Sequence, residues 1–402
     1  MHLLRSGIFL AGFVALVATQ ACGGDDTGGG SSGGSSGSSG GSSSGTSGSS
    51  SGTSGASSGT SGSSGVQPGD DDGLIPSTSP WRKSMEWYRA IDKAPVAEHS
   101  SQMIGALQQW GTTGIFQIDF SFNVLDGAGA PKVTFPPDDE SDNVPVPVPN
   151  TGYIEGDYAY GACPSGDDCH LVILDRGASR LYEVYQAGKS GSSWEGFPYM
   201  WQLDKDYPRS NRGQGCTSAD AAGLPIAPGL IGYRETKKGA INHALRFIIR
   251  NEFIRGVAGD RNVPNNVYPA SHGSMAGNSG VGVPYGARLR LKATISDTDP
   301  RIKTPGARAV VRALQTYGMI LSDGGNIPLT AESVRVHADA NPAETWEGLL
   351  EPRDLGFIKP TDFEIIGIPK SNPTGPDGWY QSKAEYEAQM KKPLGCQGIV
   401  QP

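Results

Sequence analysis

Apolar and polar side chains alternate along several short segments of the chain. Within residues 115–124, one face of an extended chain would carry Phe116, Ile118, Phe120, Phe122 and Val124. The other face would carry Gln117, Asp119, Ser121 and Asn123. Because the side chains of a strand point alternately to its two faces, this pattern predicts a strand with one buried face.

A hairpin is predicted further along the chain. Residues 170–175 and 180–185 are two short apolar segments, and residues 176–179 between them have the composition of a turn. Two additional strands are expected at 287–293, where apolar residues alternate with basic ones, and at 363–368.

Helical spacing of apolar residues is clearest at residues 305–317. Pro305 follows Thr304 there, an order that suits the first positions of a helix. Weaker helical patterns are found at 93–109 and at 382–390.

Strands therefore outnumber helices, and their order lacks the regular alternation of a βαβ fold. Residues 133–150 are rich in proline and acidic residues and are expected to run extended along the surface. We expect a mainly β (α+β) fold of antiparallel, sandwich-like sheets with a few packed helices.

The N-terminal segment has the pattern of an export signal. Residues 7–18 form an apolar run that is too short to span a bilayer comfortably, which is typical of a signal peptide. Cys22 follows a small residue and resembles the lipidated first residue of a bacterial lipoprotein. Ordinary secretion with an incidental cysteine is the alternative. We expect an exported protein, anchored by lipid to a bacterial membrane and facing the periplasm or the cell exterior.

A flexible tether is predicted after the signal peptide. Residues 23–65 are almost only Gly, Ser and Thr, and they have no large apolar side chain to offset the entropy of ordering. Such a coil spans roughly 35–40 Å. The expected organisation is a signal peptide at 1–21, a tether at 22–72, and a single large β-rich domain at 73–402.

Composition excludes several classes of partner. The net charge is −8 and the chain has no long basic run, so a nucleic-acid interface is not expected. The body has no phosphate-cradling glycine loop and no Gly-x-Ser-x-Gly motif, so we expect no cofactor and no serine esterase. A membrane would be reached only through the lipid anchor, and the protein is expected to be a monomer.

Beyond Cys22, the chain has four cysteines: Cys163, Cys169, Cys216 and Cys396. An exported chain meets an oxidising compartment, so disulfides are the default expectation. Cys163 and Cys169 flank a turn-rich loop and are expected to pair, which leaves Cys216 for Cys396. Zinc is the alternative, since His170 adjoins Cys169, but no Cys-x-x-Cys spacing supports a metal site and none is expected.

Four strings in the body share their order and spacing with a known group of proteins. They are TSADAAGLPI at 217–226, HALRF at 243–247, RLRLKA at 288–293 and YGMILSDGG at 317–325. Together they are similar to an uncharacterised family of exported bacterial β-rich proteins. The resemblance covers well under half of the chain and implies no catalytic residue. The family pattern has Asp-Asn-Gly where this chain has Asp323, Gly324 and Gly325.

The predicted hairpin could carry chemistry. If Asp175 lies opposite Arg180, then Glu183 lies opposite Val172 and His170 lies opposite Tyr185, which places His170, Glu183 and Tyr185 on one face. A histidine, a carboxylate and a phenol within reach of one another can act as general acid and base. Asp175 and Arg180 would form an ion pair on the other face. A polar sheet face with one buried carboxylate is the alternative.

Three further residues are candidates for the same site. Asp220 could be a second carboxylate opposite Glu183, as glycoside hydrolysis requires, or it could only cap a short helix. His243 lies in a segment that fits either a helix or a strand and could be a core histidine. His272 lies in a loop, where functional residues are common.

We therefore expect five residues to converge on one concave catalytic surface: His170, Glu183, Asp220, His243 and His272. Tyr185, Arg246 and Trp201 are expected to bind the substrate. The leading hypothesis is a surface-tethered carbohydrate-active enzyme that cleaves a polysaccharide by hydrolysis, with β-elimination as the less favoured alternative. A lyase would use Arg246 to neutralise a uronate.

A non-catalytic protein is the competing hypothesis. It would be a glycan-binding or structural lipoprotein of the cell surface, with Trp194, Tyr199 and Trp201 as a platform for stacking sugars.

Overall fold

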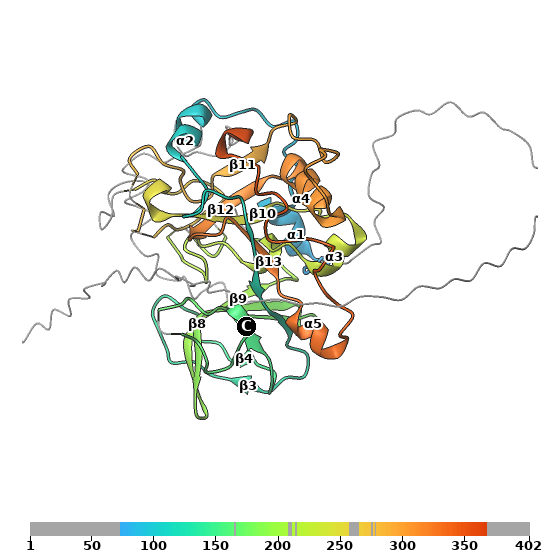
Figure 1. Ribbon diagram of the computed structural model, residues 1–402. Coiled ribbons are helices and arrows are strands. Elements are labelled where there is room, and N and C mark those ends of the chain that lie inside the picture. The colour runs from blue at the N-terminus through green and yellow to red at the C-terminus, as the bar shows by residue number, and fades with distance from the viewer. Residues whose placement is uncertain are drawn as a thin grey trace, which may run out of the picture. The chain divides into compact units, whose positions relative to one another are not determined.

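Strands dominate the part of the chain that the structure describes. In this computed structural model the described residues are 73–367, apart from 165, 208–210, 214, 257–264, 275 and 278. Their strands form a six-stranded sheet, a four-stranded sheet and two two-stranded sheets (Figure 1). The mainly β class with few helices is therefore confirmed.

The six-stranded sheet has the order β1-β13-β10-β12-β11-β14. These strands are Ile118–Phe122, Leu329–Glu332, Leu245–Ile249, Met319–Gly324, Arg288–Leu291 and Phe363–Ile365. β1 pairs with β13 and β10 with β12 in parallel, and the other neighbours are antiparallel. The expected helix is present as α4 (Pro305–Thr316), with the Thr304 side chain accepting a hydrogen bond from the Ala307 amide.

The four-stranded sheet contains the expected hairpin. Its order is β2 (Val124–Asp126), β7 (Leu171–Asp175), β8 (Arg180–Ser190) and β9 (Ser193–Gln202). β7 and β8 are antiparallel with Val172 opposite Glu183, as predicted. The predicted ion pair of Arg180 is wrong, because its guanidinium lies 2.8 Å from Asp204 rather than pairing across the strand.

The segment expected as one strand at 115–124 contributes to both sheets. β1 belongs to the six-stranded sheet, and β2 belongs to the four-stranded one. Between them, the Asn123 side chain is buried and donates hydrogen bonds to the Ile154 carbonyl at 3.2 Å and to Asp157 at 2.8 Å. The pattern of alternating apolar residues located the strand but could not show that it changes sheets.

Both faces of the four-stranded sheet are covered. Val172 and Leu181 face the main core, which they share with the six-stranded sheet, whereas Ile173 and Tyr182 face a second apolar cluster. Val146 belongs to that second cluster and is fully buried. The surface position expected for residues 133–150 is therefore wrong in part, because this segment covers the outer face of the sheet. Within it, β4 (Val146–Pro147) pairs with β3 (Lys132–Val133).

The remaining elements are short. Helices α1, α2, α3 and α5 span Pro80–Ser84, Ser100–Ala106, Tyr233–Lys238 and Arg335–Ala340, and strands β5 and β6 span Tyr153–Ile154 and Tyr158–Ala159. The helix expected at 93–109 is reduced to α2, because Val96 bridges to Ile366 and the Ala97 amide bonds to the Ile365 carbonyl at 2.8 Å. The helix expected at 382–390 lies outside the described residues.

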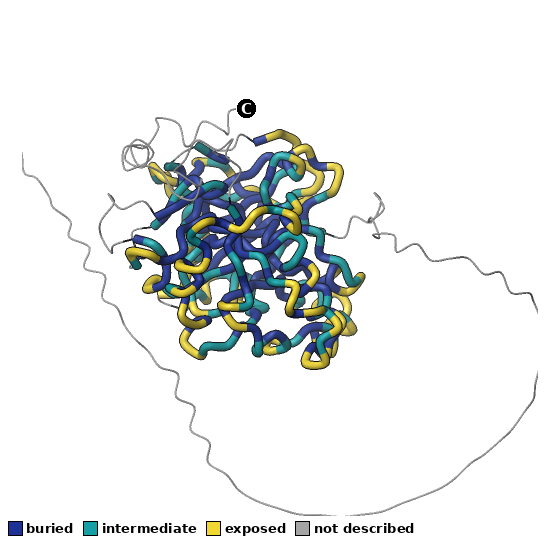
Figure 2. Tube along the Cα trace, turned by 90° about the horizontal axis from the view of Figure 1, so that it is seen from above, coloured by how far each residue is buried: buried dark blue, intermediate teal, exposed yellow. Residues whose placement is uncertain are grey.

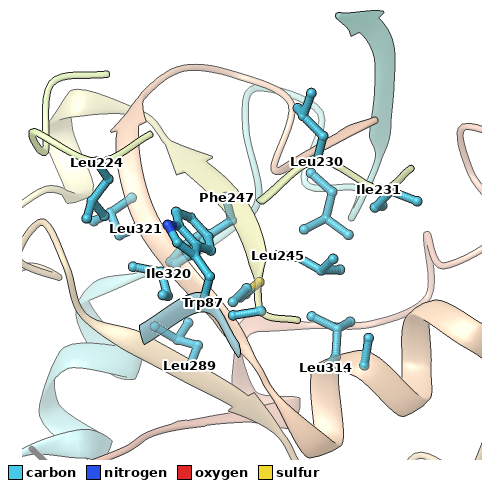
Figure 3. Packing of buried hydrophobic residues seen from close by; sticks show 14 of the residues in the cluster. Trp87, Leu224, Leu230, Ile231, Leu245, Phe247, Leu289, Leu314, Ile320 and Leu321 are labelled. Atoms are coloured by element: carbon cyan, nitrogen blue, oxygen red, sulfur yellow. The ribbon is translucent and has the colours of Figure 1, made fainter. Parts of the chain in front are cut away.

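The main core lies beside the six-stranded sheet. Figure 3 shows Trp87 packed among Leu245 and Phe247 of β10 and Ile320 of β12, with Leu314 of α4 close by. Figure 2 shows the buried trace running through the middle of the described body, with exposed residues at the turns. Polar groups on this inner side of the sheets are therefore out of water and require partners.

One expected disulfide is present. Cys163 and Cys169 are bonded, with their Cα atoms 5.9 Å apart. Cys216 is also disulfide-bonded, but Cys396 lies outside the described residues, so this pairing stays a prediction. Cys22 and the tether lie outside them too. No helix within the described ranges is long and apolar enough to cross a membrane.

Candidate functional site

Glu183 occupies the inner face of β8 and is completely buried. Its Oε1 accepts hydrogen bonds from the amides of Ile226 and Ala227, both at 2.8 Å. Its Oε2 has no hydrogen-bond partner among the described residues. Burial raises the pKa of Glu183 to about 7, even though the two amide hydrogen bonds oppose that shift. Glu183 is therefore a solvent-excluded acid rather than a group that a polymer could touch.

Asp220 and Arg246 form a buried, two-pronged ion pair. The guanidinium Nε and Nη2 lie 2.7 Å and 2.5 Å from the two carboxylate oxygens. Burial alone would lower the pKa of Arg246, but the attraction of Asp220 outweighs it and raises the pKa. Because both side chains are buried and mutually satisfied, the role expected for Arg246 in binding substrate is not supported by this arrangement.

His170 lies on the same face as Glu183 and Tyr185, as the hairpin register predicts. Its ring is 5.6 Å from the ring of Tyr185. The Nδ1 atom lies 2.7 Å from the Glu155 carboxylate, and Nε2 lies 3.1 Å from the Ala219 carbonyl. Burial would lower the pKa of His170, but Glu155 outweighs burial and raises it to about 9. His170 is therefore a cation in the ordinary pH range.

His272 and His243 have different surroundings. His272 Nδ1 lies 2.8 Å from the Ala221 carbonyl, next to Asp220 in the chain. His243 instead lies before β10, with Nε2 2.9 Å from Glu235 of α3. The expected convergence is thus partial. His170, Glu183 and Asp220 belong to one buried network, His272 contacts its edge, and His243 has a carboxylate partner of its own.

The expected aromatic platform is also buried. The exposed fractions of Trp194, Tyr199 and Trp201 are 7%, 3% and 0%. Trp201 packs in the main core and Trp194 in the second cluster, so no sugar can stack on them in this structure. The sheet that carries these residues is covered on both faces.

Asp323 lies at the end of β12, in the string where this chain departs from the family pattern. It accepts hydrogen bonds from the amides of Ala221 at 3.0 Å and Gly324 at 2.7 Å. Burial and the nearby Asp220 raise the pKa of Asp323 to about 7. A Cβ at position 324 would lie 2.3 Å from Asn251 Oδ1, so the Asn251 side chain occupies the space next to Gly324.

An open hollow lies next to Glu155, the carboxylate that contacts His170. Its volume is about 340 Å³. We call it the acidic hollow, and its lining includes Asp119, Ser121, Glu155, Tyr158, Asp167 and Asp168. Glu155 reaches from this lining to His170, so it connects the hollow with the buried network. A large substrate could reach these polar groups because they line an open space, whereas Glu183, Asp220 and Arg246 are buried.

Two of the carboxyl groups that line the acidic hollow, Asp119 and Glu155, have opposite pKa shifts. Burial raises the pKa of Asp119, although the Ser121 hydroxyl donates a hydrogen bond at 2.8 Å that opposes the rise. Burial would also raise the pKa of Glu155, but the charge and hydrogen bonds of His170 outweigh it and lower the pKa. Carboxyl groups with diverging pKa values are the pattern of an acid paired with a base.

Local structure holds these groups in place. Asp119 lies on β1 at the edge of the six-stranded sheet, on the face opposite the buried Ile118 and Phe122. Glu155 opens the 3-10 turn Glu155–Asp157, which the Asn123 side chain and Ser333 Oγ fasten through Asp157.

The rim of the acidic hollow is fixed covalently. Asp167 and Asp168 belong to the loop that the disulfide of Cys163 and Cys169 closes. The ring therefore limits how far this edge of the hollow can move.

The sequence offered an incomplete signal for this site. Asp119 and Ser121 appeared as polar positions in an aromatic strand, which also fits an ordinary solvated face. Glu155 gave no signal, because its partner His170 is 15 residues away and their contact depends on the fold. Within the described part of the chain, no group of three or more His, Cys, Asp or Glu residues is arranged to hold a metal ion.

Comparison of the chain with protein-family models, with curated proteins and with solved structures found no significant match. The geometry of the acidic hollow is therefore the basis for assigning a function.

Proposed function

We propose that this protein is an exported, surface-tethered glycoside hydrolase that cleaves a polysaccharide in the acidic hollow. The supporting observation is the pair Asp119 and Glu155, two reachable carboxyl groups whose pKa values are shifted in opposite directions. Glycoside hydrolysis uses one carboxylic acid and one carboxylate at the scissile bond. The volume of the hollow, about 340 Å³, lies within the range of ligand sites.

In this mechanism Asp119 is the general acid and gives its proton to the departing glycosidic oxygen. Glu155 remains ionised because His170 holds it, and it either takes a proton from the attacking water or attacks the sugar carbon itself. The C–O bond breaks, and the elements of water are added across it. Tyr158, which is 37% exposed on the rim, offers a ring on which a sugar can stack.

Hydrolysis is favoured over β-elimination. A lyase needs a cation that neutralises the carboxylate of the sugar undergoing elimination, and Arg246 was the candidate. Arg246 is instead buried and engaged with Asp220, and none of the described residues that line the acidic hollow is an arginine or a lysine. A purely glycan-binding lipoprotein loses its support as well, because the proposed stacking residues are buried.

The proposed location continues from the N-terminal sequence. A signal peptide, a lipid on Cys22 and a Gly/Ser tether would hold the enzyme at a bacterial surface, near polymers too large to enter the cell. The disulfide between Cys163 and Cys169 is consistent with an oxidising compartment.

The test measures reducing ends released by the full mature chain from a panel of neutral and acidic polysaccharides. Glu155→Gln and Asp119→Asn remove one functional group each, and each should reduce the rate by about 10²–10⁴-fold. Glu195→Gln is the matched control, because Glu195 is exposed on β9 and does not line the hollow. Wild-type rates in both hollow variants, or no cleavage of any polymer by the wild type, would contradict the proposal.

A further inference from the structure

A second and larger recess lies between α3, α5 and the strands β2 and β7. Its volume is about 790 Å³. We call it the basic groove, because four cationic residues, Arg176, Arg234, Lys237 and Lys238, line it. Figure 1 shows α3 and α5 on the same side of the described body. The chain as a whole has a net charge of −8, so a gathering of cations in one recess runs against its overall balance.

Three acids also line the basic groove: Asp126, Glu332 and Glu344. Asp126 is exposed, and its Oδ1 accepts a hydrogen bond from the Ala128 amide at 2.9 Å. Glu332 lies 2.9 Å from His337 Nε2 and also accepts a hydrogen bond from the Tyr233 amide at 2.9 Å. Glu344 lies 3.0 Å from the Lys237 ammonium group. The contacts of Glu332 and Glu344 leave neither carboxylate available to the two arginines.

The two arginines of the groove have unused hydrogen-bond donors. Arg176 is exposed, and toward the described residues it donates only from Nη1, to the Leu74 carbonyl at 3.1 Å. Arg234 is exposed, and among the described residues nothing pairs with its guanidinium. A guanidinium presents its donors as a planar fork that matches a carboxylate, which makes a carboxylate-bearing ligand the best fit.

We propose that the basic groove binds the carboxylates of an acidic polysaccharide, so that the substrate class is a uronate-containing glycan. This inference rests on the function proposed above. The groove is a recess, and a flat bilayer surface cannot enter it. Its lining includes the apolar residues Val124, Leu125 and Leu174, against which the apolar face of a sugar ring can pack.

The basic groove and the acidic hollow are connected through one stretch of chain. Ser121 lines the hollow and Val124 lines the groove. Three residues of extended chain span about 10 Å. In this proposal a single polymer chain places one sugar at Asp119 and Glu155 while its neighbours reach the arginines. The basic groove would bind the polymer and select negatively charged sugars, and the acidic hollow would carry out the hydrolysis.

The experiment measures binding by the full mature chain carrying Glu155→Gln, which prevents cleavage during the measurement. The probes are polygalacturonate and the same polymer with its carboxylates methyl-esterified. We expect the esterified polymer to bind at least tenfold more weakly. The double variant Arg176→Gln/Arg234→Gln should weaken polygalacturonate binding at least tenfold. Arg312→Gln is the control, because Arg312 is a surface arginine paired with Asp297 outside the groove.

Equal binding of the two polymers would overturn the inference, and so would unchanged polygalacturonate binding by the double variant. Binding of anionic lipid vesicles that depends on the two arginines, without binding of polygalacturonate, would assign the groove to a membrane instead and would also overturn it. The same measurements distinguish failure of this inference from failure of the proposed hydrolase function. If polygalacturonate binds through the two arginines but no polymer is cleaved, carboxylate binding by the basic groove is supported and the proposed hydrolase activity is refuted.

Discussion

His170 and Glu155 are joined by a contact of 2.7 Å between Nδ1 and the carboxylate, with the histidine buried and the acid lining an open hollow. The contact is asymmetric, because His170 cannot exchange its proton directly with bulk water whereas Glu155 faces a space that a ligand could enter. A buried cation therefore sets the charge of a reachable carboxylate.

This contact predicts a pH-dependent contribution to stability. The pKa of His170 is raised to about 9 from an ordinary value of 6.5. The folded state then holds the proton more tightly than the unfolded state, so the contribution is complete below pH 6.5 and is lost as the pH rises through 9. Urea unfolding of the wild type should show a fall in the free energy of unfolding across this window. The His170→Gln variant should show a smaller fall, and an identical fall would refute the role of this pair.

Glu183 should make stability depend on pH in a lower range than His170 does. Its pKa is raised to about 7 from 4.5, so the folded state favours the protonated form and loses stability as the pH rises from 4.5 to 7. Glu183→Gln keeps an oxygen for the two amide donors and cannot ionise. Because Asp323 titrates in the same range, we expect the melting temperature of the variant to decrease between pH 5 and 7.5 by less than that of the wild type. A parallel decrease in both proteins would show that Glu183 is not the titrating group.

The buried pair Asp142 and Arg212 is predicted to be important for stability. Both side chains are 1% exposed, and their closest atoms are 2.6 Å apart. Arg212→Gln leaves the carboxylate of Asp142 buried without its cation, which should cost about 3–5 kcal/mol of unfolding free energy. The exposed pair Arg312 and Asp297 provides the comparison, and Arg312→Gln should cost less than about 1 kcal/mol. Chemical denaturation of both variants tests this difference, and equal effects would contradict it.

The disulfide between Cys163 and Cys169 closes a short loop beside the acidic hollow. Replacing both cysteines by alanine should lower the free energy of unfolding by about 2–3 kcal/mol, because the unfolded chain regains the entropy that the ring removes. It should also reduce activity on polysaccharides, since Asp167 and Asp168 lie within this loop. Differential scanning calorimetry and the reducing-end assay measure the two effects. A double variant as stable as the wild type would exclude the stabilising role.

The sequence predicted local features of this fold well. The register of the hairpin placed His170, Glu183 and Tyr185 on one face because side-chain alternation and a four-residue turn define it. The helix Pro305–Thr316 followed from its apolar spacing and from Thr304 at its start. Both depend on residues that are close together in the chain.

The sequence failed where distant segments meet. Alternation shows that His170 and Glu183 share a face, but it cannot show whether that face lies under a second sheet or in water. Burial under the six-stranded sheet made Glu183 a core acid, and covering by residues 133–150 removed Trp194 from the surface. The acidic hollow was missed for the same reason, because Asp119 and Glu155 become neighbours only through the fold.

In the proposed mechanism Glu155, held ionised by His170, works with a protonated Asp119. The most direct test is the pH dependence of kcat/KM for polysaccharide hydrolysis by the wild type and by His170→Gln. We predict a bell-shaped wild-type profile, whose acid limb reports Glu155 and whose alkaline limb reports Asp119. Without His170, burial would no longer be offset, and the acid limb should move to higher pH while the alkaline limb stays in place. Identical acid limbs in the two proteins would contradict this mechanism.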